Sequence, residues 1–547
     1  MIYDKIIFNG NILTLEDSRA ANAVGVSNGK IAKVWFGNLE TETKANQWID
    51  LDGRTLIPGF IDTHNHLFMY SQQKQQLNCS TPPNKSVNDI LTLVKTEIKG
   101  TQEGKWIVGA GYDNTKLAEN RHITRKDLDK VAPDHPVFIR HISGHLAVVN
   151  SKAFEYCDVS ESIDNPSGGH FGRDADGKLD GVIYELPALE RVMQRMPKPT
   201  TEELINRLEA AAHDYLKVGI TTSTDAAVGL DLGYEEYKAH MEAVRTMKNP
   251  LYMRYMIMHH LFDDGEFSGL DAEEMAQRIE NDTNGRGKLD SVKLFQDGSI
   301  QGRTAALRDG YYGDEYFNGE LIYSQETLNK LYQRFHNEGF RITTHGNGDL
   351  AIASIIEGYS KALDQRPKEN HLHRIEHLQT AREQDLQRMA KYDIATSVFI
   401  NHVYYWGDDH RDIFLGPDRG AKIDPLASVS DHGILYTLHS DCPITPISPL
   451  FSIWAAANRL TRDGYVLGED ERISVMEGLK SMTIYGAKLN GTEDVNGSIK
   501  EGKRADFAIL DKNLLEIDPV EIKDVVIEST MIDGEVVFQL EQENKLY

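Results

Sequence analysis

Eight short apolar runs, each separated from the next by a longer segment of helical pattern, constrain the fold of this chain more than any other feature. Such alternation is typical of βαβ units and a parallel sheet. Eight strands are also the number that closes a TIM-type barrel. The sequence therefore predicts an α/β fold with a (β/α)8 barrel. The expected strands are residues 55–62, 219–226, 251–258, 290–296, 340–345, 371–377, 393–400 and 433–441.

Both ends of the chain have a different pattern, with short β-like runs joined by tight turns. An Asn-Gly pair at 9–10 and an Asp-Gly pair at 533–534 each separate two apolar runs, and such pairs are strong hairpin signals. Because chain termini often lie close together, residues 1–54 and 490–547 are predicted to form one small β-domain.

The barrel is assigned to residues 55–489, and it contains one long interruption. The stretch from about 70 to 215 lies between the first two expected strands and is too long for a loop. It has strand-like pieces of its own near residues 106 and 136. We therefore predict an inserted subdomain over this stretch.

The charge balance and the cysteines narrow the functional class. Asp and Glu number 84 against 59 Lys and Arg, a formal net charge of −25, which disfavours nucleic acid and anionic membrane as partners. Cys79, Cys157 and Cys442 show no CxxC spacing, which argues against a disulfide framework or a thiolate zinc site. The start, MIYDKIIFNGNILTLED, lacks the cationic segment and apolar run of a signal peptide, and no run approaches the ~20 apolar residues of a membrane span. A cytoplasmic protein acting on a small molecule is expected.

The strongest local motif is PGFIDTHNH, in which His64 and His66 leave the first expected barrel strand. Side chains two apart on a strand project to the same side, and TIM-type barrels carry active sites at the carboxyl ends of their strands. Neutral imidazole is a common zinc ligand. The pair is therefore predicted to chelate a metal. The alternative is an incidental pair of polar histidines leaving a strand.

Three further side chains occupy matching positions. His345 and His377 end two later expected strands, and Asp441 closes the last one. We therefore predict that they meet the first histidine pair around a divalent cation. A carboxylate at such a site can also take the proton of a metal-activated water. The alternative for Asp441 is a helix N-cap before Pro443.

Lys293 lies within an expected strand, where alternation sends Val292 and Leu294 to one face and Lys293 to the other. If the apolar pair packs against helices, Lys293 points into the barrel, and burial should lower its pKa until the amine is neutral. A neutral lysine can take up carbon dioxide and form a carbamate that bridges two cations. The alternative is an inward lysine paired with an acid such as Asp297.

These residues resemble the amidohydrolase superfamily and, more closely, amidohydrolase family 3, the YtcJ-like metal-dependent hydrolases. The motifs run nearly end to end and include IPGFIDTHNHL, VKLFQDGSIQGRTAAL, THGNGDLAI, HRIEHLQ and LHSDCPITPISPL. The resemblance implies a distorted (β/α)8 barrel with a β-sandwich from both termini, one or two zinc ions per chain, and a homodimer. By this resemblance, His64 and His66 bind the more buried metal, and His345 and His377 bind the second. A carboxylated Lys293 bridges the two metals. Asp441 binds metal and transfers the proton.

The resulting functional hypothesis is hydrolysis of a C–N bond in a small molecule by a metal-activated water. Candidates for orienting the substrate or stabilising negative charge are His141, His145 and Arg303. Arg303 could instead tie a loop by an ion pair, and His145 could satisfy buried backbone. Two other functions stay open: a mononuclear deaminase without a carbamate, and a non-catalytic ligand-binding or regulatory relative. Fold resemblance does not transfer a substrate.

Overall fold

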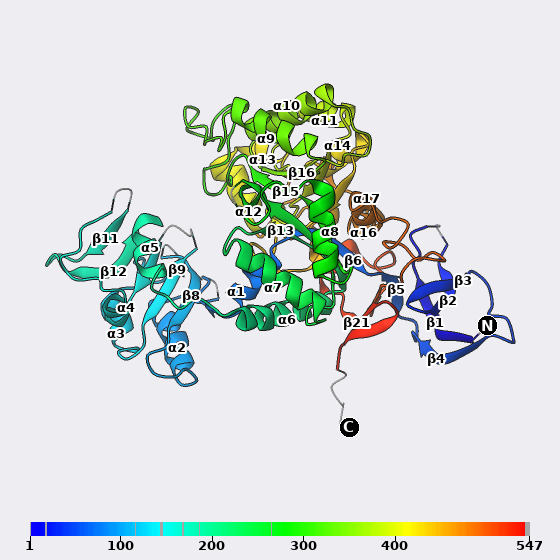
Figure 1. Cartoon of the computed structure of the whole chain (residues 1–547), viewed down its shortest axis with the longest axis horizontal. Helices are drawn as coiled ribbons and strands as arrows, with labels where there is room; N and C mark the ends of the chain where they lie inside the picture. The colour runs from blue at the N-terminus through cyan, green and yellow to red at the C-terminus, as the bar shows by residue number, and fades with distance from the viewer. Residues whose placement is uncertain are drawn as a thin grey trace. The chain divides into compact units, whose positions relative to one another are not determined.

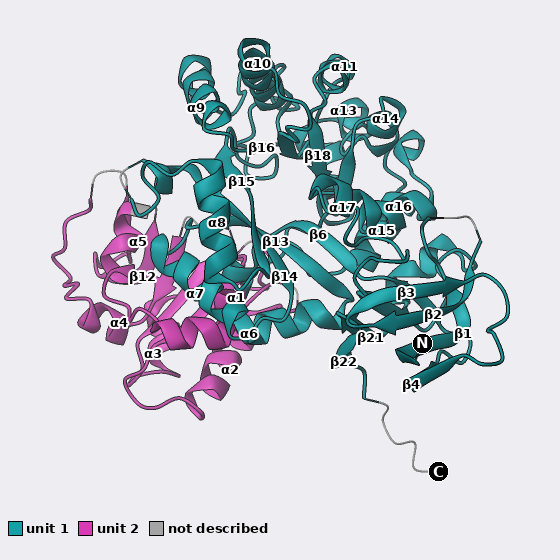
Figure 2. Cartoon of the chain, turned by 45° about the vertical axis from the view of Figure 1, so that its right-hand side comes forward, with its two compact units in different colours: residues 1–70, 208–547 teal, residues 71–207 magenta. Residues whose placement is uncertain are grey.

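The computed structural model describes most of the chain, which divides into two compact units (Figure 2). One unit comprises residues 1–70 and 208–547, and the other comprises residues 71–207. Within the described residues, no helix has both the length and the apolarity to cross a bilayer. The described residues are 2–16, 19–81, 83–114, 116–142, 146–166, 169–184, 186–263 and 265–541.

The larger unit contains a parallel sheet of eight strands that follow one another in chain order. Its two ends approach each other, because Thr63 Oγ1 on the first strand lies 2.7 Å from Thr437 Oγ1 on the last and 3.1 Å from Ser397 Oγ. The sheet is therefore nearly closed, and the predicted α/β barrel is confirmed. The strands are β6 (Phe60–Asn65), β13 (Ile220–Val228), β14 (Tyr252–Met258), β15 (Gly287–Phe295), β16 (Ile342–Gly346), β17 (Arg374–His377), β18 (Ala395–Val398) and β19 (Tyr436–Leu438).

Amphipathic helices follow these strands and surround the sheet (Figure 1). In α8 (Ala272–Asp282), Met275 and Ile279 are buried one helical turn apart, and this apolar face packs against β15. The helix begins at Asp271, whose side chain accepts hydrogen bonds from backbone N–H groups of the first turn. Other helices around the sheet are α7 (Tyr234–Arg245), α9 (Gln325–Asn337), α10 (Asp349–Gln365), α11 (Glu383–Lys391) and α14 (Leu426–Asp431).

The first expected barrel strand, residues 55–62, is split at Gly59. The part before it, β5 (Thr55–Pro58), pairs with strands from both chain ends, and only β6 enters the barrel. A Cβ atom at Gly59 would lie 2.3 Å from the side chain of Thr221, so the close approach of β13 requires glycine here. The barrel therefore begins a few residues later than the sequence predicted.

Strands from both chain ends form a second sheet in this unit, in the order β22-β21-β20-β5-β1-β2-β3, with β4 beside β1. The Asp-Gly pair at 533–534 turns between β21 and β22, and both residues have positive φ (53° and 74°), as a type I′ hairpin requires. The Asn-Gly pair at 9–10 makes no hairpin. It lies inside β1, where the pairing register with β2 shifts, as in a bulge. The strands are β1 (Ile2–Ile12), β2 (Ala21–Ser27), β3 (Lys30–Trp35), β4 (Lys44–Asp50), β20 (Phe507–Leu510), β21 (Ile527–Ile532) and β22 (Glu535–Gln539).

The smaller unit has its own six-stranded sheet, in the order β11-β12-β10-β9-β8-β7. The strand-like pieces near residues 106 and 136 are β8 and β9 of this sheet, and they take no part in the barrel. An apolar cluster of its own, which includes Ile90, Ile107 and Ile139, forms its core. The strands are β7 (Leu77–Asn78), β8 (Ile107–Tyr112), β9 (Val137–His141), β10 (Leu146–Val149), β11 (His170–Arg173) and β12 (Leu179–Tyr184).

Candidate metal centre

The carboxyl ends of three barrel strands bring four buried side chains together. His64 lies on β6, His377 ends β17, and His439 and Asp441 follow β19. Each offers one nitrogen or oxygen atom, and these four atoms all lie within 4.8 Å of one another. The carboxyl ends of the strands are where barrels of this type carry their active sites. Three predicted site residues therefore meet at the predicted edge of the barrel, together with one histidine that was not predicted.

The spacing of the donor atoms suits a shared metal ion. Asp441 Oδ1 lies 3.1 Å from His64 Nε2 and 3.2 Å from His66 Nε2. Two ligand atoms of one tetrahedral ion, with bonds of about 2.0–2.1 Å, are separated by about 3.3 Å. His64 Nε2 and Asp441 Oδ1 are buried, yet neither is aligned for a hydrogen bond with any described residue. Buried polar atoms that lack such a bond call for an explanation, and a divalent cation fits these donors.

Backbone strain occurs at two of these positions. His377 has a φ of 70° and Asp441 a φ of 53°. Left-handed conformations cost non-glycine residues of order 1–2 kcal/mol and concentrate at functional sites. The surrounding barrel therefore holds both side chains in orientations that an ordinary strand would not give.

Electrostatics favour the protonation states that bind metal. Burial lowers the pKa of His377 and of His439 well below the usual value, so both rings are neutral, the form in which imidazole binds a metal. Burial alone would raise the pKa of the Asp441 carboxyl, but the adjacent rings of His64 and His66 hold it well below its usual range. The site thus offers neutral imidazoles beside an ionised carboxylate.

His345 and Lys293 lie beside this cluster. The ring centroid of His345 is 4.5 Å from that of His377. Lys293 is fully buried inside the barrel, and its Nζ makes no hydrogen bond within the described part of the chain. Burial lowers the pKa of Lys293 to about 8, although Glu376 and Asp441 act to raise it. Asp297, considered as its partner, instead accepts hydrogen bonds from backbone N–H groups, among them that of Gly348 at 2.7 Å.

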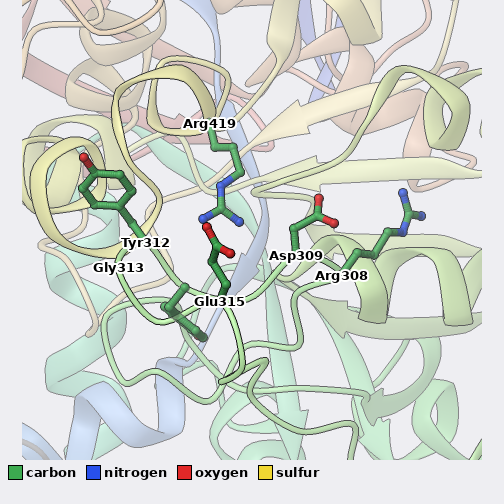
Figure 3. A pocket seen from close by; sticks show the side chains of 7 residues that line it. Arg308, Asp309, Tyr312, Gly313, Glu315 and Arg419 are labelled. Atoms are coloured by element: carbon green, nitrogen blue, oxygen red, sulfur yellow. The ribbon is translucent and has the colours of Figure 1, made fainter.

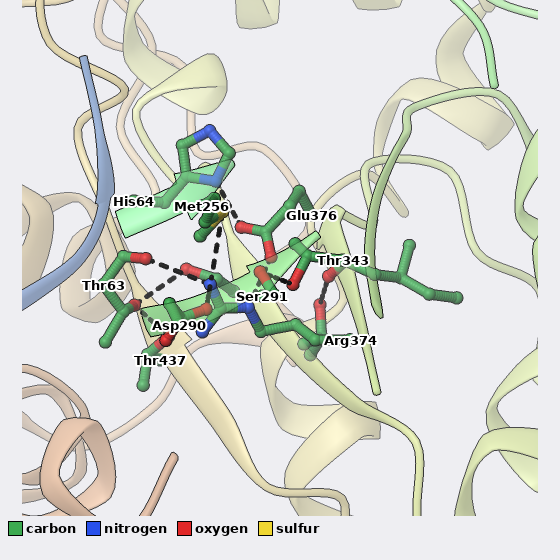
Figure 4. A network of polar contacts seen from close by, with 12 residues as sticks. Thr63, His64, Met256, Asp290, Ser291, Thr343, Arg374, Glu376 and Thr437 are labelled. Atoms are coloured by element: carbon green, nitrogen blue, oxygen red, sulfur yellow. Dashed lines mark hydrogen bonds and ion pairs between the residues drawn. The ribbon is translucent and has the colours of Figure 1, made fainter. Parts of the chain in front are cut away.

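A buried chain of charges supports His64 from behind (Figure 4). Its Nδ1 contacts a carboxylate oxygen of Glu376, and Arg374 Nε donates to the other oxygen. Arg374 Nη2 also lies 3.3 Å from Asp290 Oδ2. Burial would raise the pKa of Glu376, but Arg374 and His64 hold it at about 2. A carboxylate on Nδ1 fixes the histidine tautomer and leaves Nε2 for a metal.

Sequence reasoning missed Glu376 and His439, although both lie next to predicted residues. Glu376 immediately precedes His377, and His439 is two residues before Asp441. The period-two spacing could have placed His439 on the face of Asp441. His439 Nε2 is 3.1 Å from His377 Nδ1, and its own Nδ1 is 2.8 Å from Ser397 Oγ.

Replacing Glu376 with Gln tests the support of His64. A neutral amide keeps the shape but loses the charge that orients the imidazole. We expect the affinity for metal to fall about 10–100-fold, the usual cost of losing such a partner. Competition with a chelating dye would measure it, with the exposed Glu369→Gln as the control. Unchanged affinity would show that Glu376 does not orient the ligand.

Replacing Asp290 with Asn tests the buried arginine cluster below the site. The Asp290 carboxylate lies 3.1 Å from both Arg254 and Arg341 and 3.3 Å from Arg374. The variant leaves three guanidinium groups without their shared anion, so we expect the free energy of unfolding to fall by about 3–5 kcal/mol at pH 7.

This loss should depend on pH. Burial would raise the pKa of Asp290, but the three arginines hold it well below the usual range. A depressed folded-state pKa stabilises the protein fully above the unfolded value of about 3.9 and progressively less below it. The gap between wild type and Asp290→Asn should therefore narrow as pH falls below about 4. Urea unfolding at several pH values would measure it, and a constant gap would contradict this explanation.

Two of the three predicted substrate contacts lie among the described residues, and neither belongs to the set of four clustered side chains. His141 ends β9 in the smaller unit, with its ring 5.0 Å from that of Tyr112. His145 lies outside the described residues. Arg303 forms an ion pair with Asp314 at 2.9 Å. This contact agrees with the alternative interpretation of Arg303, an ion pair that ties a loop.

A cavity of 510 Å³ lies elsewhere in the larger unit, among polar side chains after β15 (Figure 3). Arg308 donates to Asp385 at 2.7 Å and Arg419 to the Gly310 carbonyl at 2.7 Å, so both guanidiniums already have partners. None of the clustered histidines lines this cavity. Its lining residues are Arg308, Asp309, Tyr311, Tyr312, Gly313, Glu315 and Arg419.

The fold and the cluster together define a barrel protein built to hold a divalent metal at the carboxyl ends of its parallel strands. Comparison with known proteins makes this more specific. Residues 47–538 match the amidohydrolase family, and the chain belongs to that family. The resemblance seen in the sequence motifs is thereby confirmed.

Individual relatives match along almost the whole chain. YtcJ of Bacillus subtilis (strain 168), an amidohydrolase by name, is 28% identical and aligns over 98% of this chain and 99% of its own length. The N-substituted formamide deformylase of Arthrobacter pascens is 28% identical over 97% of both chains. The crystal structure of an uncharacterized metal-dependent hydrolase from Pyrococcus furiosus superposes with a TM-score of 0.74, with 26% identity over 94% of this chain and 100% of that one.

Proposed function

We propose that this protein is a metal-dependent hydrolase that cleaves the C–N bond of a small amide, formamide, carbamate or cyclic amide. The convergence of His64, His377, His439 and Asp441 at the carboxyl ends of the barrel strands carries the proposal. The likeness to an N-substituted formamide deformylase supports a C–N bond as the target and makes formamides the first substrates to test.

We assign the metal ligands in the same proposal. The unpaired Nε2 atom of His64 and the Asp441 carboxylate support these two as ligands, and zinc suits the imidazole and carboxylate donors. His439 contacts His377 Nδ1 and is itself held by Ser397, so we assign it to positioning His377. The proposed set for one or two ions is His64, His66, His345, His377, Asp441 and Lys293 as its carbamate.

The carbamate explains a buried lysine that has no hydrogen bond to any described residue. In its neutral form, which the lowered pKa of about 8 makes more accessible, the Lys293 amine adds to carbon dioxide, a new N–C bond forms, and one proton leaves. The product is an anion with two oxygen atoms. It replaces a costly buried ammonium by a group that attracts the metals. The full burial of Nζ and its lack of a hydrogen bond within the described residues support this step.

Asp441 carries the proton in the proposed reaction. A bound divalent metal lowers the pKa of water from 15.7 toward 7 and polarises a carbonyl oxygen. The Asp441 carboxylate is ionised and lies beside both His64 and His66. It accepts the proton that the attacking water loses and returns it to the nitrogen that leaves, the two roles of a general base and then a general acid.

We also infer the domain organisation from the two sheets outside the barrel. Residues 71–207 have a separate sheet and core, which supports an inserted subdomain. The second sheet of the larger unit combines strands before residue 59 with strands after residue 506, which supports a β-domain made from both chain ends.

Metal analysis combined with a hydrolysis screen tests the function. We expect purified protein to contain a divalent metal and to hydrolyse members of a library of N-substituted formamides, amides, carbamates and cyclic imides. A chelator should abolish the activity and added metal should restore it. Release of ammonia from heterocycles by protein with one ion and an unmodified Lys293 would favour the deaminase, and inertness of metal-loaded protein toward every class would favour a ligand-binding relative.

A further inference from the structure

A second cluster of buried metal-ligating side chains lies outside the centre described above. Asp225 comes from β13, and Glu236 and His240 come from α7 (Figure 1). Each offers one ligand atom, and these three atoms lie within 4.8 Å of one another. The three residues are 1%, 2% and 0% exposed. The cluster thus joins a barrel strand to the helix that follows it.

The contact between His240 and Asp225 resembles that between His64 and Asp441 in its distance and in its lack of hydrogen-bond alignment. His240 Nε2 lies 3.2 Å from Asp225 Oδ2, close to the 3.1 Å between His64 Nε2 and Asp441 Oδ1. Neither ring nitrogen of His240 is aligned for a hydrogen bond with any described residue. Two groups that share a proton would be aligned for a hydrogen bond, and these two are not. Their close approach is better explained if both are ligands of one cation.

The charges around the cluster also call for a cation. Asp225 Oδ2 accepts a hydrogen bond from the backbone of Phe68 at 2.9 Å, and Glu236 accepts one from the backbone of Asp231 at 3.2 Å. Across the described ranges, neither carboxylate forms an ion pair with a lysine or arginine. Two buried carboxylates are costly unless their charge is compensated. One divalent cation with a neutral imidazole would balance both.

Another unpaired group borders the cluster. The ring of Tyr255, on β14, lies 5.3 Å from the ring of His240. This tyrosine is fully buried, and its hydroxyl has no hydrogen-bond partner in the described part of the chain. Unpaired buried groups of this kind are rare in native proteins, and each calls for an explanation such as a bound water or ion.

We propose that Asp225, Glu236 and His240 bind a divalent cation at a site separate from the catalytic centre. One nitrogen and two carboxylate donors suit zinc and similar transition metals, whereas magnesium and calcium prefer oxygen ligands alone. The site is enclosed, and Asp225 also holds the backbone N–H of Phe68, two residues after His66. The ion therefore has a structural role, in which it fixes α7 against β13 and steadies the segment that follows β6, where His66 lies.

The test first removes metal binding from the candidate catalytic centre. In a His64→Ala/His377→Ala/Asp441→Ala variant, native mass spectrometry should still find one divalent ion per chain. X-ray absorption at its edge should show an oxygen-rich shell with a single imidazole. Adding His240→Gln should remove that ion, whereas His213→Gln, which changes an exposed histidine, should leave it in place.

Three results would overturn the proposal: no ion in the triple variant, an ion that survives His240→Gln, or a shell with more than one imidazole. If the His240→Gln protein does not fold, the ion count and the absorption spectrum of the triple variant decide the question without it. None of these measurements depends on catalytic activity, so the second site can fail while the proposed hydrolase function stands.

Discussion

Replacing Asp441 with Asn should lower turnover by about 10³-fold or more while the protein keeps its metal. Proton transfer by a positioned group contributes typically about 10²–10⁴-fold, and the amide can neither accept the proton of water nor return it to the leaving nitrogen. The amide oxygen can still act as a ligand. The metal content should therefore change much less than kcat.

Steady-state kinetics on the best substrate of the screen, together with elemental analysis, would measure both effects. Asp431→Asn is a suitable control because Asp431 ends α14 on the exposed side of the same strand–helix repeat. Near-normal turnover by Asp441→Asn protein with its full metal content would remove this carboxylate from proton transfer.

Replacing Lys293 with Ala should cost at least about 10²-fold in activity and most of the bound metal, because it removes an anion that would help to hold the metal. The fully buried side chain leaves a cavity inside the barrel. A short carboxylate such as acetate or propionate can enter that cavity and supply two oxygen atoms. We therefore expect partial rescue of activity and metal content by these acids.

The matched control is Lys288→Ala on the same strand. Lys288 pairs with Glu280 at 2.8 Å, and its side chain is 45% exposed. Its loss should therefore leave the metal content unchanged, and the short acids should have no effect on this variant. Mass spectrometry of intact wild-type protein under non-denaturing conditions should also show the added carbon dioxide. A Lys293→Ala enzyme that is fully metallated and active would end the carbamate proposal.

Much of the barrel could be predicted because its signals are local. Apolar runs that alternate with helical patterns identify the strands, and a histidine or aspartate at a strand's carboxyl end lies at the edge of the barrel where active sites form. The split at Gly59 could not be read in this way, because it depends on contact with Thr221, far away in the sequence. The bulge at Asn9 likewise depends on how β2 pairs with β1.

The support behind the metal ligands was harder to predict. In the sequence, Glu376 looks like an ordinary strand residue. Its contact with His64 arises only in the fold, where β17 and β6 bring the two side chains together. The left-handed backbone of His377 and Asp441 also arises from tertiary packing, since local sequence preference opposes it. In the second cluster, Glu236 and His240 are spaced one helical turn apart in the sequence, but the approach of Asp225 appears only in the fold.

Metal-edge anomalous diffraction from crystals of the wild-type protein is the most direct test of the metal centre. We predict a peak at the carboxyl end of the barrel, within about 2.0–2.2 Å of His64 Nε2, His66 Nε2 and an Asp441 carboxylate oxygen. Metal-replete crystals with no peak bounded by these three side chains would contradict the account.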